Sequence, residues 1–317
     1  ASGNENALKW PPWASSWGDR YSQEKTIEAF KWLNENGLHA RGHVMVWPSW
    51  KHLPKDVQKL KDTPERVPSI VREHIVDIAT KMKPYVDEWD VINETRSNHD
   101  LMDLFGSEIM VEWFKTAREC LPDTPLFIND YAILNGKGAG SKNHEAYKKT
   151  IRFLLDNGAP VTGIGFQSHI GANLPNPAKV IEIIDDFATF GLAMRITEFD
   201  VDIQQEETQA QFTRDFMTAV FSHPGVVGFQ MWGFWEGRHW KPAGAMYRKN
   251  WEEKPNGAAY RDLVFREWWT REHGLTDTKG ELSVRGFLGD YEVTVTAGEQ
   301  KQVVPVSLGK ESGPVTV

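Results

Sequence analysis

Strand-like and helix-like segments alternate along most of the 317-residue sequence, and this alternation constrains the fold more than any other feature. Short apolar runs predict strands at residues 5–10, 38–47, 88–94, 125–129, 162–169, 192–198 and 226–232. Longer periodic segments predict helices at residues 22–36, 64–83, 107–120, 143–157, 178–190, 206–222 and 256–270. An α/β fold built from repeated βα units is therefore expected.

The predicted strands are one fewer than a closed barrel needs, and the first of them is short. A closed parallel barrel of this type has eight strands. An open doubly wound sheet would carry a glycine-rich phosphate turn, which this sequence lacks. We therefore expect a (β/α)8 TIM barrel that lacks its first strand and helix in this chain. Because such a barrel exposes strand edges, we expect an upstream fragment to complete it or another segment to fill the gap.

The pattern changes at about residue 273. Segments 282–287, 291–296 and 302–308 are short and β-rich, with glycine or polar breaks between them. We expect a TIM-barrel domain over residues 1–272 and a small β-rich appendage of three or four strands over residues 273–317. The appendage is too small to be stable alone, so we expect it to pack on the barrel.

Two of the predicted strands end in a glutamate. Glu94 closes the run Trp89-Asp90-Val91-Ile92-Asn93-Glu94, and Glu198 closes residues 192–198. If both strands belong to one parallel sheet, their carboxyl ends lie on the same face, where α/β folds place their sites. Two carboxylates facing one cleft can cleave a glycosidic bond as acid and nucleophile, or as acid and base. Structural ion pairs also use such positions, so the neighbouring residues matter.

Polar and aromatic residues occupy the neighbouring strand ends. His43 follows Arg41 and Gly42 on one strand, Gln167 and His169 end another, and Trp47 and Trp232 end two more. A histidine on such a strand is more often a satisfied structural group than a ligand. Here, however, several polar strand ends converge, which favours a functional site.

Composition favours a neutral ligand. The formal charge of −8 argues against nucleic acid or an anionic membrane as partner, since both need clustered Lys and Arg. The chain has 14 tryptophans, and flat aromatic faces at strand ends suit sugar rings. Four tryptophans lie in helical patterns and are expected to pack instead: Trp32, Trp113, Trp268 and Trp269.

Several other features limit the class of protein. The single cysteine, Cys120, excludes an internal disulfide framework. No apolar run approaches the ~20 residues of a membrane span, and the N-terminus lacks a signal-peptide pattern. None of the ten histidines has a zinc-binding spacing, so no metal is expected. We expect a soluble protein whose export signal has been removed.

Six blocks of the sequence resemble those of glycoside hydrolase family 10, the endo-β-1,4-xylanases. They are residues 5–10, 41–47, 89–94, 128–131, 165–169 and 196–200, in the family's order. The run at residues 231–236 and the C-terminal tail resemble the plant-type branch of the family. The resemblance implies an extracellular, retaining enzyme that hydrolyses xylan by double displacement without a cofactor.

The resemblance also implies roles for individual residues. Glu94 would be the general acid and base and Glu198 the nucleophile, with their carboxyl groups about 5 Å apart. His169 matches the histidine that hydrogen-bonds the nucleophile, Asp200 the acid that orients this histidine, and Asn93 the residue that binds the sugar 2-hydroxyl. The implied substrate-binding residues are Glu5, Asn6, Lys9, His43 and Trp47 on the glycone side, the stacking residues Trp232 and Trp240, and Gln167 and Tyr131.

This chain departs from the family near one of these blocks. Many members continue Val-Trp-His-Ser-Gln where residues 46–50 read Val-Trp-Pro-Ser-Trp, so Pro48 and Trp50 alter the nearby subsites. Two alternatives therefore stay open. One is a related glycosidase with a different substrate, and the other is a catalytically silent carbohydrate-binding protein. Retention of both glutamates argues against the silent protein.

Overall fold

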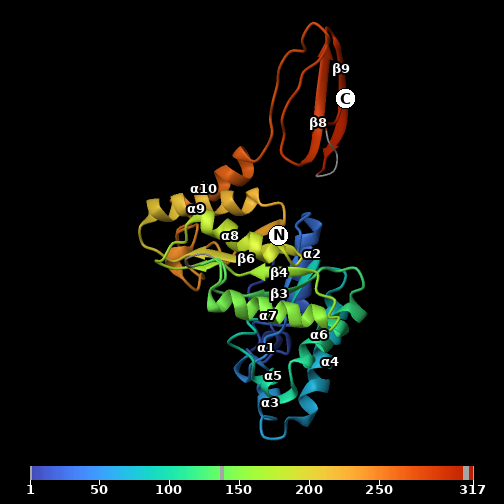
Figure 1. Cartoon of the computed structure of the whole chain (residues 1–317), viewed down its shortest axis with the longest axis vertical. Helices are drawn as coiled ribbons and strands as arrows, with labels where there is room; N and C mark the ends of the chain where they lie inside the picture. Colours follow the sequence, from blue (N-terminus) through green and yellow to red (C-terminus); the bar gives the residue numbers. More distant parts are fainter. Residues whose placement is uncertain (1, 136–138, 310–313, 317) are drawn as a thin grey trace. The chain divides into compact units, whose positions relative to one another are not determined.

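The parallel sheet predicted from the βα alternation is present in the computed structural model, which describes residues 2–135, 139–309 and 314–316. Its strands are β1 (Arg41–Val46), β2 (Glu88–Asn93), β3 (Leu126–Asp130), β4 (Gly163–Phe166), β5 (His169–Ile170), β6 (Ala193–Val201) and β7 (Val226–Met231). They pair in the order β1-β2-β3-β4-β6, and β5 and β7 each pair with β6. Figure 1 shows β3, β4 and β6 side by side.

Helices follow the strands as the sequence predicts. The longer ones are α2 (Gln23–Glu35), α4 (Val67–Met82), α6 (Glu108–Cys120), α7 (Lys142–Asp156), α8 (Pro177–Ala188), α9 (Glu206–Ser222) and α10 (Pro255–Asp262). Short helices are α1 (Trp10–Trp13), α3 (Lys55–Gln58) and α5 (Asp100–Phe105). Ser22 and Ser141 cap α2 and α7 by accepting a hydrogen bond from a backbone N–H of the first turn. The predicted helix boundaries are thus confirmed to within a few residues, except that α10 ends at Asp262 and a π-helical turn follows it.

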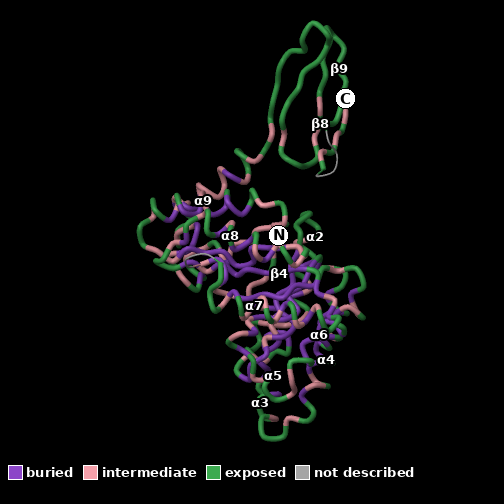
Figure 2. The backbone as a smooth tube through the Cα atoms, in the orientation of Figure 1, coloured by how far each residue is buried: buried purple, intermediate pink, exposed green. Residues whose placement is uncertain are grey.

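The strands form the core of the residue 1–256 part of the chain. Every residue of β1, β2, β3 and β4 is buried (Figure 2). Such burial is expected for parallel strands that are covered on both faces. In contrast, β7 is only partly buried, and its Val227 is 50% exposed. The sheet is therefore well packed at its centre and less covered along β7.

The N-terminal segment differs from its prediction. Residues 5–8 form turns and α1 begins at Trp10, so the strand predicted over residues 5–10 is wrong. Pro11 and Pro12 explain the difference, because proline favours the first positions of a helix. Parallel pairing occurs earlier, where the Ser2 N–H donates to the His39 carbonyl at 2.7 Å.

The C-terminal region has fewer strands than predicted. By its internal contacts the chain divides after Asn256 into two units. In the second, β8 (Gly289–Ala297) and β9 (Gln300–Leu308) pair along their whole length around a turn at Gly298, where φ is +59°. Residues 282–287 form no strand. The prediction of three or four strands in the appendage is therefore wrong for the described residues. The domain boundary after residue 272, and packing of the appendage on the barrel, stay predictions.

The tryptophans that lie in helical patterns differ in their exposure. Trp113 is 2% exposed, as predicted, but Trp32 is 58% exposed and Trp269 57%, so the packing predicted for these two is wrong. In α2 the buried residues are Thr26 and Phe30, and a residue two positions after Phe30 points away from that face. Within the described ranges, no helix is both long and apolar enough to cross a bilayer.

Candidate active site

The strand register brings the predicted site residues to one end of the sheet. Asn93 pairs with Asn129, and His169 pairs with Asp200. Glu94 directly follows β2, and its backbone N–H donates to the Asn129 carbonyl at 2.9 Å. The carboxyl ends of parallel strands meet at one edge, so residues far apart in the sequence become neighbours here.

Glu198 is 4% exposed and is held at both carboxylate oxygens. Asn129 Nδ2 donates to Oε1 at 2.7 Å, His169 Nε2 lies 3.2 Å from Oε2, and His43 Nδ1 lies 3.9 Å from Oε1. Burial opposes ionisation of Glu198, but His43, His169 and Lys9 outweigh it and hold the pKa of this carboxyl down to about 2. Glu198 is therefore ionised at neutral pH, the form in which a carboxylate can attack an electrophile.

His169 lies between two carboxylates. Its Nδ1 lies 2.9 Å from Asp200 Oδ2, while its Nε2 faces Glu198. Burial alone would lower the pKa of His169, but the hydrogen bonds and charges of the two acids raise it to about 9. A protonated imidazole donates from both nitrogens, which matches this arrangement. The structure brings together the three residues as the sequence analysis expected, and their catalytic roles stay predictions.

Glu94 has the opposite electrostatics. Its Oε1 accepts from Gln167 Nε2 at 3.0 Å and its Oε2 from Asn98 Nδ2 at 2.9 Å. Burial raises the pKa of Glu94; the hydrogen bond from Gln167 opposes this, and the negative charge of Glu198 adds to it, so the pKa lies above its ordinary value. Two carboxyls whose pKa values move apart in one site are suited to act as acid and nucleophile.

A chain of side-chain amides joins the two acids. Gln167 Nε2, which donates to Glu94, also donates to Asn93 Oδ1 at 3.1 Å. Asn129 Nδ2, which donates to Glu198, also donates to Asn93 Oδ1 at 3.0 Å. The predicted site residues Asn93 and Gln167, together with Asn129, thus connect the two acids. This hydrogen-bond network resists movement of either acid.

Sequence reasoning did not assign Asn129 to the site. Thr197 Oγ1 donates to Asn129 Oδ1 at 2.7 Å, which fixes the amide orientation. Gly165 on the next strand leaves room for this side chain, since a Cβ there would lie 2.4 Å from Asn129 Oδ1. The sequence feature that could have identified Asn129 was a polar residue near the end of a buried strand, opposite a glycine-rich strand. Its contact with Glu198 depends on the register.

The N-terminal segment adds a cation beside the acids. Lys9 Nζ donates to Asn6 Oδ1 at 2.9 Å and lies 5.4 Å from the ring centroids of both Trp47 and Trp232. Burial lowers the pKa of Lys9, against the opposing effect of nearby glutamates that include Glu5. Three other predicted glycone-side residues, Glu5, Asn6 and Trp47, therefore lie near the Lys9 ammonium group, together with the predicted stacking residue Trp232.

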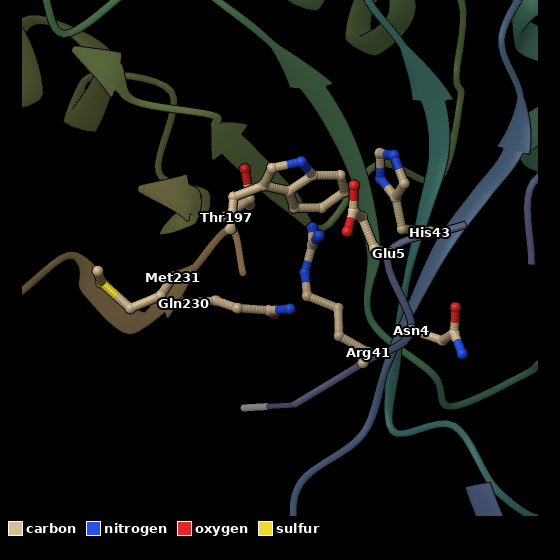
Figure 3. Close-up of a pocket in the computed structure, with 9 residues that line it drawn as sticks. Asn4, Glu5, Arg41, His43, Thr197, Gln230 and Met231 are labelled. Carbon is tan, nitrogen blue, oxygen red and sulfur yellow. The ribbon is translucent and has the colours of Figure 1, made fainter. Parts of the chain in front are cut away.

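A pocket opens between the N-terminal segment, β1, β6 and β7 (Figure 3). Its lining comprises Gly3, Asn4, Glu5, Arg41, His43, Thr197, Gln230, Met231 and Trp232. Glu5 and His43 come from separate elements and lie beside each other in this view. Both predicted binding residues therefore face one concave surface.

Two of the lining residues, Arg41 and His43, take part in a cluster of buried ion pairs. Arg41 pairs with Glu88, at 2.8 Å from Nε to Oε1, and its remaining nitrogens pair with Asp90. Arg195 Nε lies 2.8 Å from Glu88 Oε1, and His43 Nδ1 lies 2.9 Å from Asp90 Oδ2. Buried charges are tolerated only when paired, so this cluster fixes the relative positions of β1, β2 and β6. It orients His43 towards the site.

The two tryptophans predicted to stack on a sugar differ in their exposure. Trp232 is 9% exposed, with its ring edge-on to His43 at 5.3 Å and to His169 at 6.2 Å. Trp240 is 52% exposed, and its Nε1 donates to Asp200 Oδ2 at 2.7 Å. Trp240 is thus held by its indole edge while its ring stays accessible to a ligand.

The segment around Pro48, where the sequence differs from the family that it resembles, makes several close contacts. Trp47 stacks on His52, with ring centroids 3.5 Å apart. Burial, with the charge of Lys51, lowers the pKa of His52 to about 4, so this imidazole is neutral. Trp50 is 9% exposed, and its backbone N–H donates to Asp100 Oδ2 at 2.9 Å. His52 is a neighbour of the site that sequence reasoning missed.

Tyr131 contacts Arg96 and Asp130, unlike the predicted site residues that contact the two acids. Its ring lies under the guanidinium of Arg96, 4.9 Å from the centroid. Its backbone N–H donates to Asp130 Oδ1 at 2.8 Å. Among the contacts of the described residues, none joins its side chain to Glu94 or Glu198, and its role in binding stays a prediction.

Asp130, at the end of β3, is a further buried acid that sequence reasoning missed. It is 1% exposed, and besides Tyr131 its polar neighbours include Thr95, whose Oγ1 lies 3.5 Å from Oδ2. Burial raises the pKa of Asp130 to about 7; the Tyr131 N–H opposes the shift, and the charge of Glu94 adds to it. Asp130 is therefore protonated in mildly acidic solution.

Replacing Asp130 by Asn should change how stability depends on pH. An unfolded aspartate ionises near pH 3.9, so between about pH 4 and pH 7 the folded wild type holds a proton that the unfolded chain has lost, and folding weakens as pH rises. Asn cannot ionise. The unfolding free energy of Asp130→Asn minus that of wild type should therefore increase over this range, by on the order of a few kcal/mol. Urea denaturation at several pH values measures it, with the exposed Asp123→Asn as control. A constant difference contradicts the expectation.

The chain is similar to known proteins over most of its length. The sequence profile described as "Glycosyl hydrolase family 10" matches residues 3–263. The chain is 30% identical over 300 residues to Endo-1,4-beta-xylanase 1 of Arabidopsis thaliana, covering 94% of this chain and 31% of that protein. It is 29% identical over 312 residues to the anti-sigma-I factor RsgI6 of Acetivibrio thermocellus, covering 98% of this chain and 40% of that protein. The chain thus spans less than half the length of these two curated relatives.

A solved structure is also similar. Xylanase 10B from Thermotoga petrophila in complex with xylobiose aligns with a TM-score of 0.72 and 27% identity, over 84% of this chain and 85% of that chain. With the parallel sheet described above, this similarity confirms the predicted (β/α)8 TIM-barrel class.

Proposed function

The chain belongs to glycosyl hydrolase family 10, and from this premise we propose that it is a retaining endo-β-1,4-xylanase. The observation that carries the proposal is the opposed electrostatics of two acids in one hydrogen-bonded site: the pKa of Glu198 is lowered to about 2, whereas that of Glu94 is raised. Such a pair supplies a nucleophile and a proton donor at the same pH.

The proposed reaction has two steps. Glu198 attacks the anomeric carbon, the glycosidic bond breaks, and Glu94 gives its proton to the departing oxygen. Glu94, now ionised, takes a proton from water, whose oxygen displaces Glu198 from the glycosyl ester and restores both acids. His169 and Asn129 donate to Glu198 and so orient its attacking oxygens. The second inversion returns the anomeric centre to its starting configuration.

Xylan is the proposed substrate. The aligned Thermotoga petrophila xylanase was solved with xylobiose, which supports a xylose-based ligand. In this chain Trp232 lies edge-on to His169, and Trp240 bonds Asp200 while its ring stays accessible. Lys9 and His43 offer hydrogen-bond donors to sugar hydroxyls, and the aromatic faces suit sugar rings. No cofactor enters the proposed reaction.

Hydrolysis of xylo-oligosaccharides followed by proton NMR tests the proposal. The first-formed product should carry the β-anomeric signal, with the α-anomer appearing later by mutarotation. First appearance of the α-anomer would refute a retaining mechanism. Activity on a glucan but not on xylan, in a panel that includes arabinoxylan and aryl glycosides, would identify the related glycosidase with a different substrate instead.

A second candidate function is carbohydrate binding without hydrolysis. It is favoured by the similarity, over 98% of this chain, to a protein named as an anti-sigma-I factor. The lowered pKa of Glu198 and the raised pKa of Glu94 favour the enzyme. Calorimetric binding of xylohexaose that leaves the oligosaccharide intact after prolonged incubation would establish the binding protein.

We propose that a polypeptide segment outside residues 1–317 covers β7, because Val226–Met231 is partly exposed while the central strands are buried. Intact mass spectrometry of the purified preparation, seeking a co-purifying fragment, tests this.

We also propose that the protein acts outside the cell, since its proposed substrate is a polymer. Absence of the protein from the culture medium would contradict this proposal.

A further inference from the structure

An aromatic cluster lies on the loop after β7, apart from the acids. Trp235 and Trp251 stack with ring centroids 5.4 Å apart and an interplanar angle of 10°. Phe234 and Tyr247 lie 6.2 and 6.3 Å from Trp251. Trp251 is 59% exposed and Phe234 54% exposed. We call these four residues the aromatic platform.

The platform is held rigidly. Trp235 Nε1 donates to the Lys249 carbonyl at 3.2 Å. The Gly237 backbone packs closely against the same indole, since a Cβ at this position would lie 2.3 Å from it. Trp251 has φ of +69°, a conformation uncommon for a bulky residue, and its N–H donates to the Arg248 carbonyl at 2.9 Å. A strained backbone thus holds a large apolar ring in solvent, and such exposure often marks a binding surface.

Arg248 fixes this loop to the barrel. Its guanidinium donates to both carboxylate oxygens of Glu206, at the start of α9, at 2.8 and 2.9 Å. A bidentate pair restricts orientation as well as distance. The ring of Trp251 is therefore preorganised, which lowers the entropy cost of binding a ligand.

The platform belongs to the same stretch of chain as Trp232 and Trp240 of the candidate active site. Phe234 and Trp235 follow Trp232, and the Trp235 carbonyl accepts from the His239 N–H at 3.0 Å in a tight turn. Trp240, the next residue, bonds Asp200 through its indole. One loop therefore carries both the indole that bonds Asp200 and the exposed rings of the platform.

We propose that the aromatic platform binds a segment of xylan outside the cleft. This inference rests on the proposed function, because it needs a polymer longer than the site around Glu94 and Glu198. The exposed indole face of Trp251 suits the axial C–H groups of a pyranose ring. Charged groups at the rim, including Glu236 and Lys249, can meet the ring hydroxyls. A short substrate held at these two acids is expected not to reach the platform.

Trp251→Ala tests the proposal. We expect the dissociation constant for soluble xylan, from affinity electrophoresis, to rise roughly three- to tenfold, as for loss of one aromatic contact. On para-nitrophenyl β-xylobioside, kcat/KM should be unchanged. Trp251→Phe keeps an aromatic face and should recover most of the affinity for xylan. Trp32→Ala is the matched control, since Trp32 is exposed to the same degree, 58%, but lies on α2.

The outcomes separate this proposal from the proposed function. Unchanged xylan affinity in Trp251→Ala, or an equal loss in Trp32→Ala, would overturn the platform. So would a parallel loss of activity on the aryl xylobioside, because Trp251 would then act on the acids or on folding. A wild-type protein that leaves the aryl xylobioside intact refutes the proposed function, while its affinity for xylan still reports on the platform.

Discussion

Glu198→Ala should abolish xylan hydrolysis, with kcat lower by roughly 10⁴-fold or more, the scale seen when a covalent nucleophile is removed. Glu198 is the acid held ionised, and it receives hydrogen bonds from Asn129 and His169. Without its carboxylate no glycosyl ester can form. Reducing-sugar assays on xylan and release of nitrophenol from an aryl xylobioside both measure the loss.

A small anion can show that Glu198 itself is the nucleophile. Azide fits the space left by the missing carboxylate, and attack from that side yields an α-glycosyl azide after one inversion. Activity in Glu198→Ala should therefore return with added azide, with this product detected by NMR. The exposed Glu207→Ala serves as the control for loss of a glutamate. Near wild-type turnover in Glu198→Ala without azide would refute the role.

Glu94→Ala should lower kcat on xylan by about 10²- to 10⁴-fold, the usual contribution of general acid–base catalysis. A xylose leaving group needs the proton of Glu94, whereas dinitrophenolate does not. The variant should therefore form the glycosyl ester normally from a dinitrophenyl xylobioside and then stall, giving a burst of dinitrophenol in stopped-flow measurements. Azide should release the ester as a β-glycosyl azide, opposite in configuration to the Glu198→Ala product.

The pH dependence of kcat/KM provides a second test of the role of Glu94 as proton donor. Glu198 is ionised above about pH 2, and Glu94 stays protonated up to its raised pKa, so wild-type kcat/KM should be bell-shaped. The basic limb should reflect loss of the Glu94 proton. In Glu94→Gln with the dinitrophenyl substrate this limb should disappear. A basic limb that stays in place would assign it to another group.

The fold class could be predicted because it depends on periodicity. Burial on both faces makes parallel strands read as apolar runs, and the helices between them keep a 3.6-residue pattern, as in α9, whose bounds match the prediction. Residues 5–10 and 282–287 were misjudged because a short apolar run does not specify its partner strand. Trp32 was misjudged because an aromatic residue in a helix can lie on either face.

The sequence by itself determined the alternation of elements and the two glutamates at strand ends, because local propensity and hydrophobic pattern are written in neighbouring residues. Only the tertiary structure decided which groups surround each acid. Asn129 reaches Glu198 through the strand register, and Gly165 leaves the space for it. The opposed pKa shifts follow from burial and charge contributed by distant segments, so they exist only once the chain has folded.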